Sequence, residues 1–144
     1  MNPRSDRDRD PAGRARQARP RDALGRPLPY GSPGVEPVPE EALPPEESIS
    51  EARRLVDEGR AFAAHEVLEA RWKAAPAHER DLWQGLAQIC VGFTHSDRGN
   101  HVGARRLVER GTKRILNYDT TGGPTYGLDL TAVVDCARSR VPSD

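Results

Sequence analysis

The segment ERDLWQGLAQICVGFTHS, residues 79–96, decides the fold of this chain. Its apolar residues recur at i, i+4, i+7 and i+11, the spacing of one helix face, and they are Leu82, Leu86, Ile89 and Phe93. The opposite stripe is more polar and carries Gln84, Gln88, Val91 and His95. A helix flanked in this way is expected to be central, with its second stripe facing another helix or a pocket.

Four further helices are predicted around this segment, at residues 49–58, 61–74, 101–116 and 130–137. Ser48 and Glu51 fit a capping box at the start of the first helix, and Gly59 fits a left-handed cap at its end. Asp129 fits the cap of the last helix. No segment shows sustained alternation of apolar and polar residues, so we predict an all-α fold, a compact multihelical bundle.

A repeat at a spacing of 40 residues aligns Gly59-x4-Ala64-x2-Val67-Leu68-Glu69 with Gly99-x4-Ala104-x2-Leu107-Val108-Glu109. Glycine at the turn and alanine five positions later are typical of tetratricopeptide-like hairpins. Two copies are too few for a solenoid. We therefore predict two tetratricopeptide-like helical hairpins that fold on each other, followed by a short C-terminal helix.

Residues 1–47 differ in composition from the rest of the chain. They hold 10 of the 13 prolines and no lysine, and residues 1–26 carry 8 arginines and 4 aspartates whereas residues 27–47 carry 5 glutamates. Such a segment has too little apolar area to offset the entropy of ordering. We predict a disordered Pro/Arg-rich arm at residues 1–47 and a helical bundle domain at residues 48–140.

The overall composition excludes several classes of protein. The chain of 144 residues has 22 basic and 22 acidic side chains, which makes a nucleic-acid partner unlikely on charge alone. The basic residues of segment 101–116 are interrupted by Glu109 and are interpreted as a solvated helix face. No apolar run is long enough to span a bilayer and no signal peptide is evident, so the expected location is the cytoplasm.

Polar residues at interior positions are the candidates for function. On segment 61–74, His65 falls in the middle of the apolar face and is expected to be buried, with Glu69 at the edge of that face. Because segments 61–74 and 79–96 are antiparallel neighbours, their polar side chains can converge in one cluster. Its candidate members are His65, Glu66, Glu69, Gln84, Gln88 and His95. The cluster is either a structural brace or a binding or catalytic site.

A metal site is weakly indicated. His65-Glu66-Val67-Leu68-Glu69 resembles the zinc-protease motif H-E-x-x-H, but Glu69 stands where the second histidine belongs. His65, Glu69 and His95 remain weak candidate ligands. Cys90 lies on the apolar side of its helix and is interpreted as a core residue. The sequence names no cofactor.

Three motifs together resemble the domain of unknown function 309 family. They are Phe62-x-x-His65-Glu66-Val67-Leu68-Glu69-x-x-Trp72, Glu79-Arg80-Asp81-Leu82-Trp83-Gln84-Gly85-Leu86-Ala87-Gln88 and His95-x-x-Arg98-Gly99-Asn100-x-x-Gly103-Ala104. The resemblance covers about residues 50–117 and implies a small multihelical domain of bacteria and plants with no established activity. It also implies that the polar cluster contains the hallmark residues of the family.

Two functional hypotheses follow. The first is a non-catalytic module that binds a protein partner or a small ligand, as the hairpin repeat and the arm suggest. The alternative is a metal-dependent or acid/base hydrolase that uses His65, Glu69 and His95.

Overall fold

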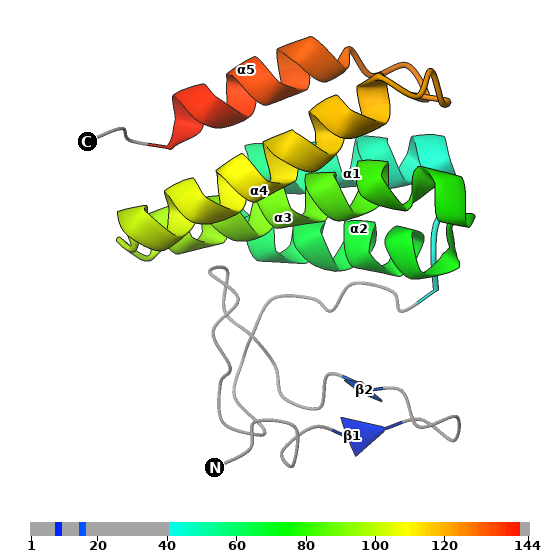
Figure 1. Cartoon of the computed structure of the whole chain (residues 1–144). Coiled ribbons are helices and arrows are strands. Elements are labelled where there is room, and N and C mark those ends of the chain that lie inside the picture. The colour runs from blue at the N-terminus through cyan, green and yellow to red at the C-terminus, as the bar shows by residue number, and fades with distance from the viewer. Residues whose placement is uncertain (1–7, 10–14, 17–40, 142–144) are drawn as a thin grey trace.

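The computed structural model describes residues 8–9, 15–16 and 41–141, and in this part of the chain it confirms the all-α fold (Figure 1). The helices are α1 (Pro45–Asp57), α2 (Ala61–Ala74), α3 (Arg80–Asp97), α4 (His101–Asp119) and α5 (Leu130–Arg140), and a 3-10 turn, η2 (Ala77–Glu79), lies directly before α3. Two short strands, β1 (Asp8–Arg9) and β2 (Ala15–Arg16), pair in antiparallel fashion. Most of the predicted arm lies outside the described residues.

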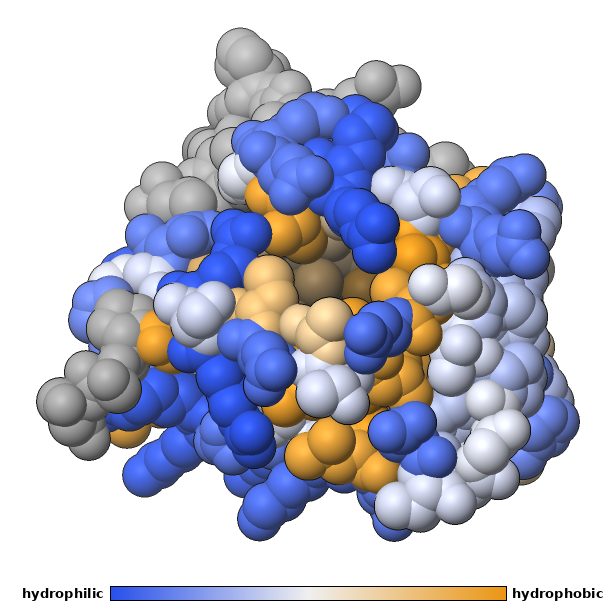
Figure 2. Space-filling view, turned by 90° about the horizontal axis from the view of Figure 1, so that it is seen from above, coloured by the Kyte–Doolittle hydropathy of each residue, from blue (hydrophilic) through white to orange (hydrophobic). Residues whose placement is uncertain are grey.

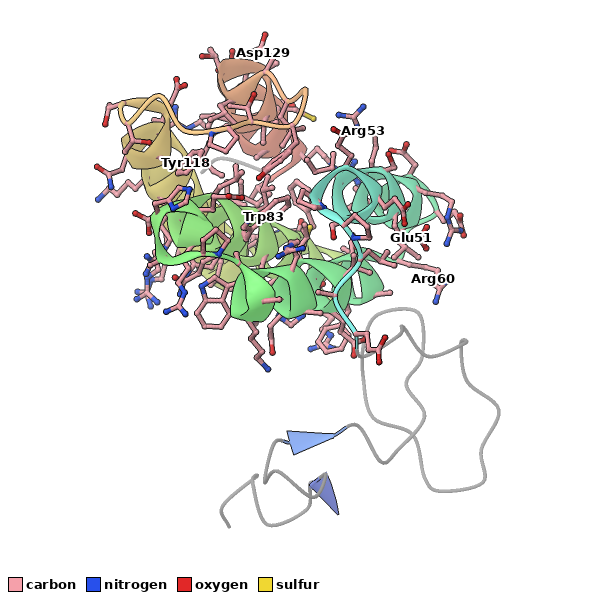
Figure 3. All side chains as sticks on the ribbon, turned by 90° about the vertical axis from the view of Figure 1, so that its right-hand side faces the viewer. Glu51, Arg53, Arg60, Trp83, Tyr118 and Asp129 are labelled. Atoms are coloured by element: carbon pink, nitrogen blue, oxygen red, sulfur yellow. The ribbon has the colours of Figure 1, made fainter. Side chains whose placement is uncertain are left out.

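The helices pack in chain order, α1 on α2, α2 on α3, α3 on α4 and α4 on α5. Seen from the side (Figure 3), α5 lies above the other helices, with α4 below it on one side and α1 on the other. As predicted, α3 is central, because it packs against both α2 and α4. No described helix is long and apolar enough to cross a membrane.

The contact between α3 and α4 depends on two glycines that face each other. A Cβ atom added to Gly85 would lie 2.9 Å from the carbonyl oxygen of Gly111, and one added to Gly111 would lie 2.6 Å from the carbonyl oxygen of Gly85. Neither contact is possible for a larger residue unless the backbone moves. These two glycines therefore permit a close approach of α3 and α4.

The start of α1 differs from the prediction. The helix begins at Pro45, not at residue 49, since a proline at the first helical position and the acidic Glu46 and Glu47 in the first turn both favour a helix start. Ser48 lies inside the helix, where its hydroxyl donates a hydrogen bond to the Leu43 carbonyl oxygen, 3.0 Å away. The predicted capping box at Ser48 and Glu51 is therefore wrong.

The other boundaries agree more closely with the sequence. Gly59 and Gly99 adopt φ values of +77° and +87°, the left-handed conformation that ends a helix. The Asp129 side chain accepts a hydrogen bond from the Ala132 amide, as predicted for the cap of α5. Helix α4 extends to Asp119 because Tyr118 is buried and its hydroxyl donates to the Pro124 carbonyl oxygen at 2.7 Å. The tetratricopeptide-like character of the hairpins stays a prediction.

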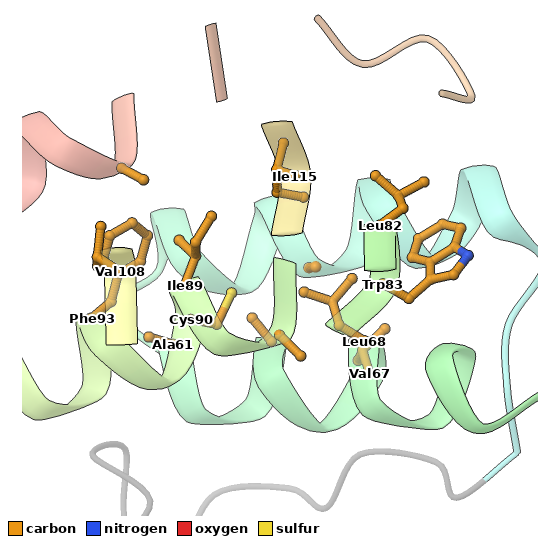
Figure 4. Packing of buried hydrophobic residues seen from close by; sticks show 14 of the residues in the cluster. Ala61, Val67, Leu68, Leu82, Trp83, Ile89, Cys90, Phe93, Val108 and Ile115 are labelled. Atoms are coloured by element: carbon orange, nitrogen blue, oxygen red, sulfur yellow. The ribbon is translucent and has the colours of Figure 1, made fainter. Parts of the chain in front are cut away.

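The hydrophobic core runs along α3 (Figure 4). Leu82, Ile89 and Phe93 point from α3 toward the α5 side, and Val67 and Leu68 enter from α2. Cys90 is buried, as expected of a core residue, and burial raises the pKa of its thiol to about 12.

Candidate functional site

The structure joins two of the candidate residues directly. His65 and Glu69 are one turn apart on α2, and His65 Nε2 lies 2.8 Å from Glu69 Oε2. The hydrogen bond with His65 is the main reason why the pKa of Glu69 falls from 4.5 to about 2. Lys73 Nζ contacts the other carboxylate oxygen of Glu69 at 3.0 Å. The Glu69 carboxylate is therefore shared between two groups on its own helix.

His65 is largely but not fully buried, with 17% of its side chain exposed. Its ring lies against Phe62, with the centroids 5.3 Å apart. The Nδ1 atom is inaccessible to solvent and has no hydrogen-bond partner. A buried nitrogen without a hydrogen-bond partner costs free energy, so the Nδ1 side of the His65 ring is less well accommodated than the Nε2 side, which faces Glu69.

The two glutamine candidates belong to the other side of α3. Arg114 of α4 donates from Nε to Gln88 Oε1 at 3.2 Å and from Nη1 to Asp81 Oδ1 at 3.1 Å. Gln84 is half-buried on the same stripe. The part of the stripe around Gln88 therefore faces α4, as predicted, because Arg114 of α4 donates hydrogen bonds to Gln88 and to Asp81 of α3.

The remaining candidates have other positions. His95 Nδ1 lies 3.1 Å from Asn100 Nδ2, at the turn between α3 and α4. Glu66 is half-buried on α2. The expected single cluster is thus divided into a His65–Glu69 pair, a Gln88–Arg114–Asp81 group and a His95–Asn100 pair.

The division bears on the hydrolase hypothesis. In the part of the chain that the structure describes, no group of three or more His, Cys, Asp or Glu side chains could hold a metal ion. His65, Glu69 and His95 do not form such a group, since His95 contacts Asn100 while His65 contacts Glu69. A metal site made of these three residues is therefore not formed.

A buried carboxylate that the sequence analysis did not single out is Glu79. It lies between η2 and α3 and is 6% exposed. Its Oε1 atom accepts hydrogen bonds from Tyr126 Oη at 2.8 Å and from Trp83 Nε1 at 3.3 Å. The rings of Trp83 and Tyr126 stack, with centroids 5.8 Å apart. Glu79 thus joins the α2–α3 turn to the loop between α4 and α5.

This group, Glu79 with Trp83 and Tyr126, has the properties of a structural anchor. Burial and the hydrogen bond to Glu79 both raise the pKa of Tyr126, so its hydroxyl stays protonated and keeps donating. Glu79, Trp83 and the surrounding residues were already part of the motif at residues 79–88. In the sequence, Glu79 looks like an exposed acidic residue in the first turn of a helix. Only the fold shows that the loop between α4 and α5 covers it.

The face formed by α5 and α1 is hollowed, and apolar side chains line the hollow (Figure 2). The apolar stripe of α3 points toward the α5 side of the molecule (Figure 4). Leu86 is partly exposed, although Leu82, Ile89 and Phe93 on the same stripe are buried. A partly exposed leucine in the middle of a buried stripe indicates that no element of the fold covers this point.

The walls of the hollow come from the first and last helices. On α1, Ile49 and Val56 are partly buried, and Arg53 between them points upward beside α5 (Figure 3). On α5, Arg138 forms an ion pair with Glu109 of α4. At about 100° per residue, Val133, Cys136 and Arg140 lie on the side of α5 opposite Arg138. We use the term apolar hollow for the surface formed by Ile49, Arg53, Val56, Leu86, Val133, Cys136 and Arg140.

Sequence reasoning missed the apolar hollow for a definable reason. Periodicity identifies Leu86 as a core residue, and nothing in the pattern tells whether another helix covers it. One weak signal in the sequence pointed to an uncovered surface. The helices α1, α3 and α5 each present an apolar stripe, and the described part of the chain has too few other helices to cover all three.

Comparison with known proteins gives a family match for the middle of the chain. Residues 49–107 match the family described as Domain of unknown function (DUF309). The chain is also 34% identical over 79 residues to the uncharacterized protein YpuF of Bacillus subtilis (strain 168), a match that covers 54% of this chain and 45% of that protein. The chain thus spans about half the length of this relative, and no solved structure matches. The resemblance indicated by the motifs is confirmed, and residues 49–107 carry the sequence signature of the DUF309 family.

Proposed function

We propose that this domain is a non-catalytic binding module that takes a partner in the apolar hollow between α1 and α5. The observation that carries the proposal is the hollow lined by apolar side chains in Figure 2, together with the partial exposure of Leu86 on the otherwise buried stripe of α3. Contiguous apolar surface rimmed by polar residues is characteristic of interaction sites. The proposal keeps the cytoplasmic location that the sequence predicts.

The polar groups support a structural role better than a chemical one. The polar side chains contact one another in three separate groups, His65 with Glu69, Arg114 with Gln88 and Asp81, and Glu79 with Tyr126 and Trp83. Acid–base catalysis needs such groups to converge on one reacting atom. The apolar hollow, by contrast, is concave and exposes apolar side chains to water. Burial of these side chains against a partner would favour binding.

The test uses an apolar fluorescent dye, bis-anilinonaphthalene sulfonate, and two matched variants. Val133→Glu places a carboxylate in the wall of the apolar hollow. Val102→Glu makes the same change on α4, where Val102 is 55% exposed and lies outside the hollow. We expect the wild type and Val102→Glu to bind the dye while folded, and Val133→Glu to lose at least about tenfold in dye affinity.

Unfolding monitored by circular dichroism ensures that both variants are folded during the titration. Equal dye binding by Val133→Glu and Val102→Glu, or no binding by the folded wild type, would show that the apolar hollow is not a binding surface.

A further inference from the structure

We infer that the occupant of the apolar hollow is an amphipathic helix of a partner protein, with acidic residues beside its apolar stripe. The inference rests on the proposed function and specifies the partner of the same site.

The walls and floor of the hollow are helices throughout. Helix α1 forms one wall, α5 the other and α3 the floor, so their backbone N–H and C=O groups are bound within each helix. An extended peptide adds to a protein by hydrogen bonding with a free strand edge, and these walls offer none. A helix satisfies its own backbone and needs only an apolar surface to pack against.

The lining side chains favour a helix over a proline-rich segment. Polyproline recognition uses grooves of aromatic side chains. Here the lining is aliphatic, with Ile49, Val56, Leu86 and Val133. The nearest aromatic ring, Phe93, is covered by the guanidinium of Arg140, 4.8 Å from the ring centroid. Aliphatic ridges of this kind interdigitate with leucines at i, i+3, i+4 and i+7 of another helix.

The charges on the two walls indicate the charge that a partner should carry. Arg53 projects from the middle of the α1 wall (Figure 3), and Arg140 of α5 places its guanidinium over the Phe93 ring of α3. The neighbouring Arg54 is paired with Glu51 and Glu58, whereas Arg53 has no carboxylate partner among the residues described. An exposed arginine beside an apolar surface selects a partner with a carboxylate at the matching position.

The acids near the hollow do not reverse this preference. Glu46 and Asp57 are exposed on the same side of α1 as Arg53, but they lie toward the two ends of the helix. On α5, the Asp129 carboxylate is engaged in capping, through the Ala132 amide. The middle of the apolar hollow is therefore cationic on both walls, and a helix with acids at its centre fits best.

The chain provides its own reporter for this binding event. Cys136 is exposed on the α5 wall, whereas Cys90 is buried and its pKa is raised to about 12. Thiol labelling at neutral pH therefore modifies Cys136 selectively. An environment-sensitive fluorophore at Cys136 reports occupation of the hollow, and Cys136→Ser with the same treatment controls for labelling elsewhere.

The probes are synthetic peptides of about 18 residues, five helical turns, added to the labelled full-length protein. One carries a leucine stripe flanked by glutamates, a second has lysine in place of each glutamate, and a third scrambles the first. We expect the glutamate peptide to bind at least about tenfold more tightly than the other two at low salt, and to gain helical circular dichroism on binding. Arg53→Glu should reverse the preference between glutamate and lysine peptides, while Arg110→Glu on the exposed side of α4 should leave it unchanged.

Other occupants are included as competing probes, namely laurate, a peptide of residues 17–40, and a second copy of the chain assessed by light scattering. Tighter binding by any of these, or equal binding of the glutamate and lysine peptides, would overturn the acidic-helix inference. If dye binding still depends on Val133, the proposed function survives that failure. If the dye also fails to bind, both are wrong.

Discussion

The two sides of α3 are packed in opposite ways. Toward α4, Gly85 and Gly111 bring the backbones so close that an added Cβ would meet a carbonyl oxygen at 2.9 or 2.6 Å. On its apolar stripe, by contrast, Leu86 is partly exposed between buried neighbours, and the face formed by α1 and α5 is hollowed (Figure 2). The same helix thus forms a rigid seam on one side and an open surface on the other, which separates the residues that hold the fold from those available to a partner.

The largest effect is expected from breaking the seam. Gly111→Val places a branched side chain against the Gly85 carbonyl oxygen and Ile89, and should lower the free energy of unfolding by about 3 kcal/mol. The matched change in the open surface, Leu86→Phe, should cost less than about 1 kcal/mol because the hollow has room for the larger ring. Urea unfolding of both variants measures the difference. Equal losses would show that the two sides of α3 are packed alike.

A smaller effect is expected at the Glu79 anchor. Glu79→Ala leaves the Trp83 indole and the Tyr126 hydroxyl without their acceptor and should cost about 2 kcal/mol. Tyr126→Phe removes one of the two hydrogen bonds and should cost about 1 kcal/mol. If both variants unfold in urea at the wild-type midpoint, the anchor does not contribute to stability.

The smallest effect is expected at the His65–Glu69 pair, and it depends on pH. Because the folded-state pKa of Glu69 is lowered from 4.5 to about 2, the pair stabilises the fold above pH 4.5, and this contribution is lost as the pH falls from 4.5 through 2. Glu69 is 38% exposed, so solvent screening reduces the contribution to about 1 kcal/mol.

Glu69→Gln tests this contribution by thermal unfolding at a series of pH values. The variant should be less stable than the wild type at pH 6, and the two curves should converge near pH 2. A constant difference across this range would mean that the carboxylate charge is not involved.

The helices were predictable because their signals are local. The apolar spacing of residues 79–96, the left-handed Gly59 and the Asp129 cap each act within a few residues. The start of α1 was predicted too late because Pro44 and Pro45 resemble the proline-rich segment before them. A proline in the first turn can nevertheless begin a helix.

The candidate site was predictable only in part, since it depends on contacts far apart in the sequence. The His65–Glu69 pair follows from helical spacing. The hydrogen bond from Arg114 to Gln88 spans 26 positions and that from Tyr126 to Glu79 spans 47, and no pattern within one helix specifies either. The apolar hollow depends on the placement of α1 and α5, which only the assembled fold determines.

The backbone of Tyr126 has a consequence for how α5 is attached. Tyr126 adopts φ +52°, a conformation that residues other than glycine rarely adopt, and Gly127 follows at φ +87°. The hydrogen bond to Glu79 holds this bend just before the chain enters α5. Residues 126–127 therefore fix the direction from which the chain enters α5, and the Glu79 carboxylate on another part of the chain holds that direction.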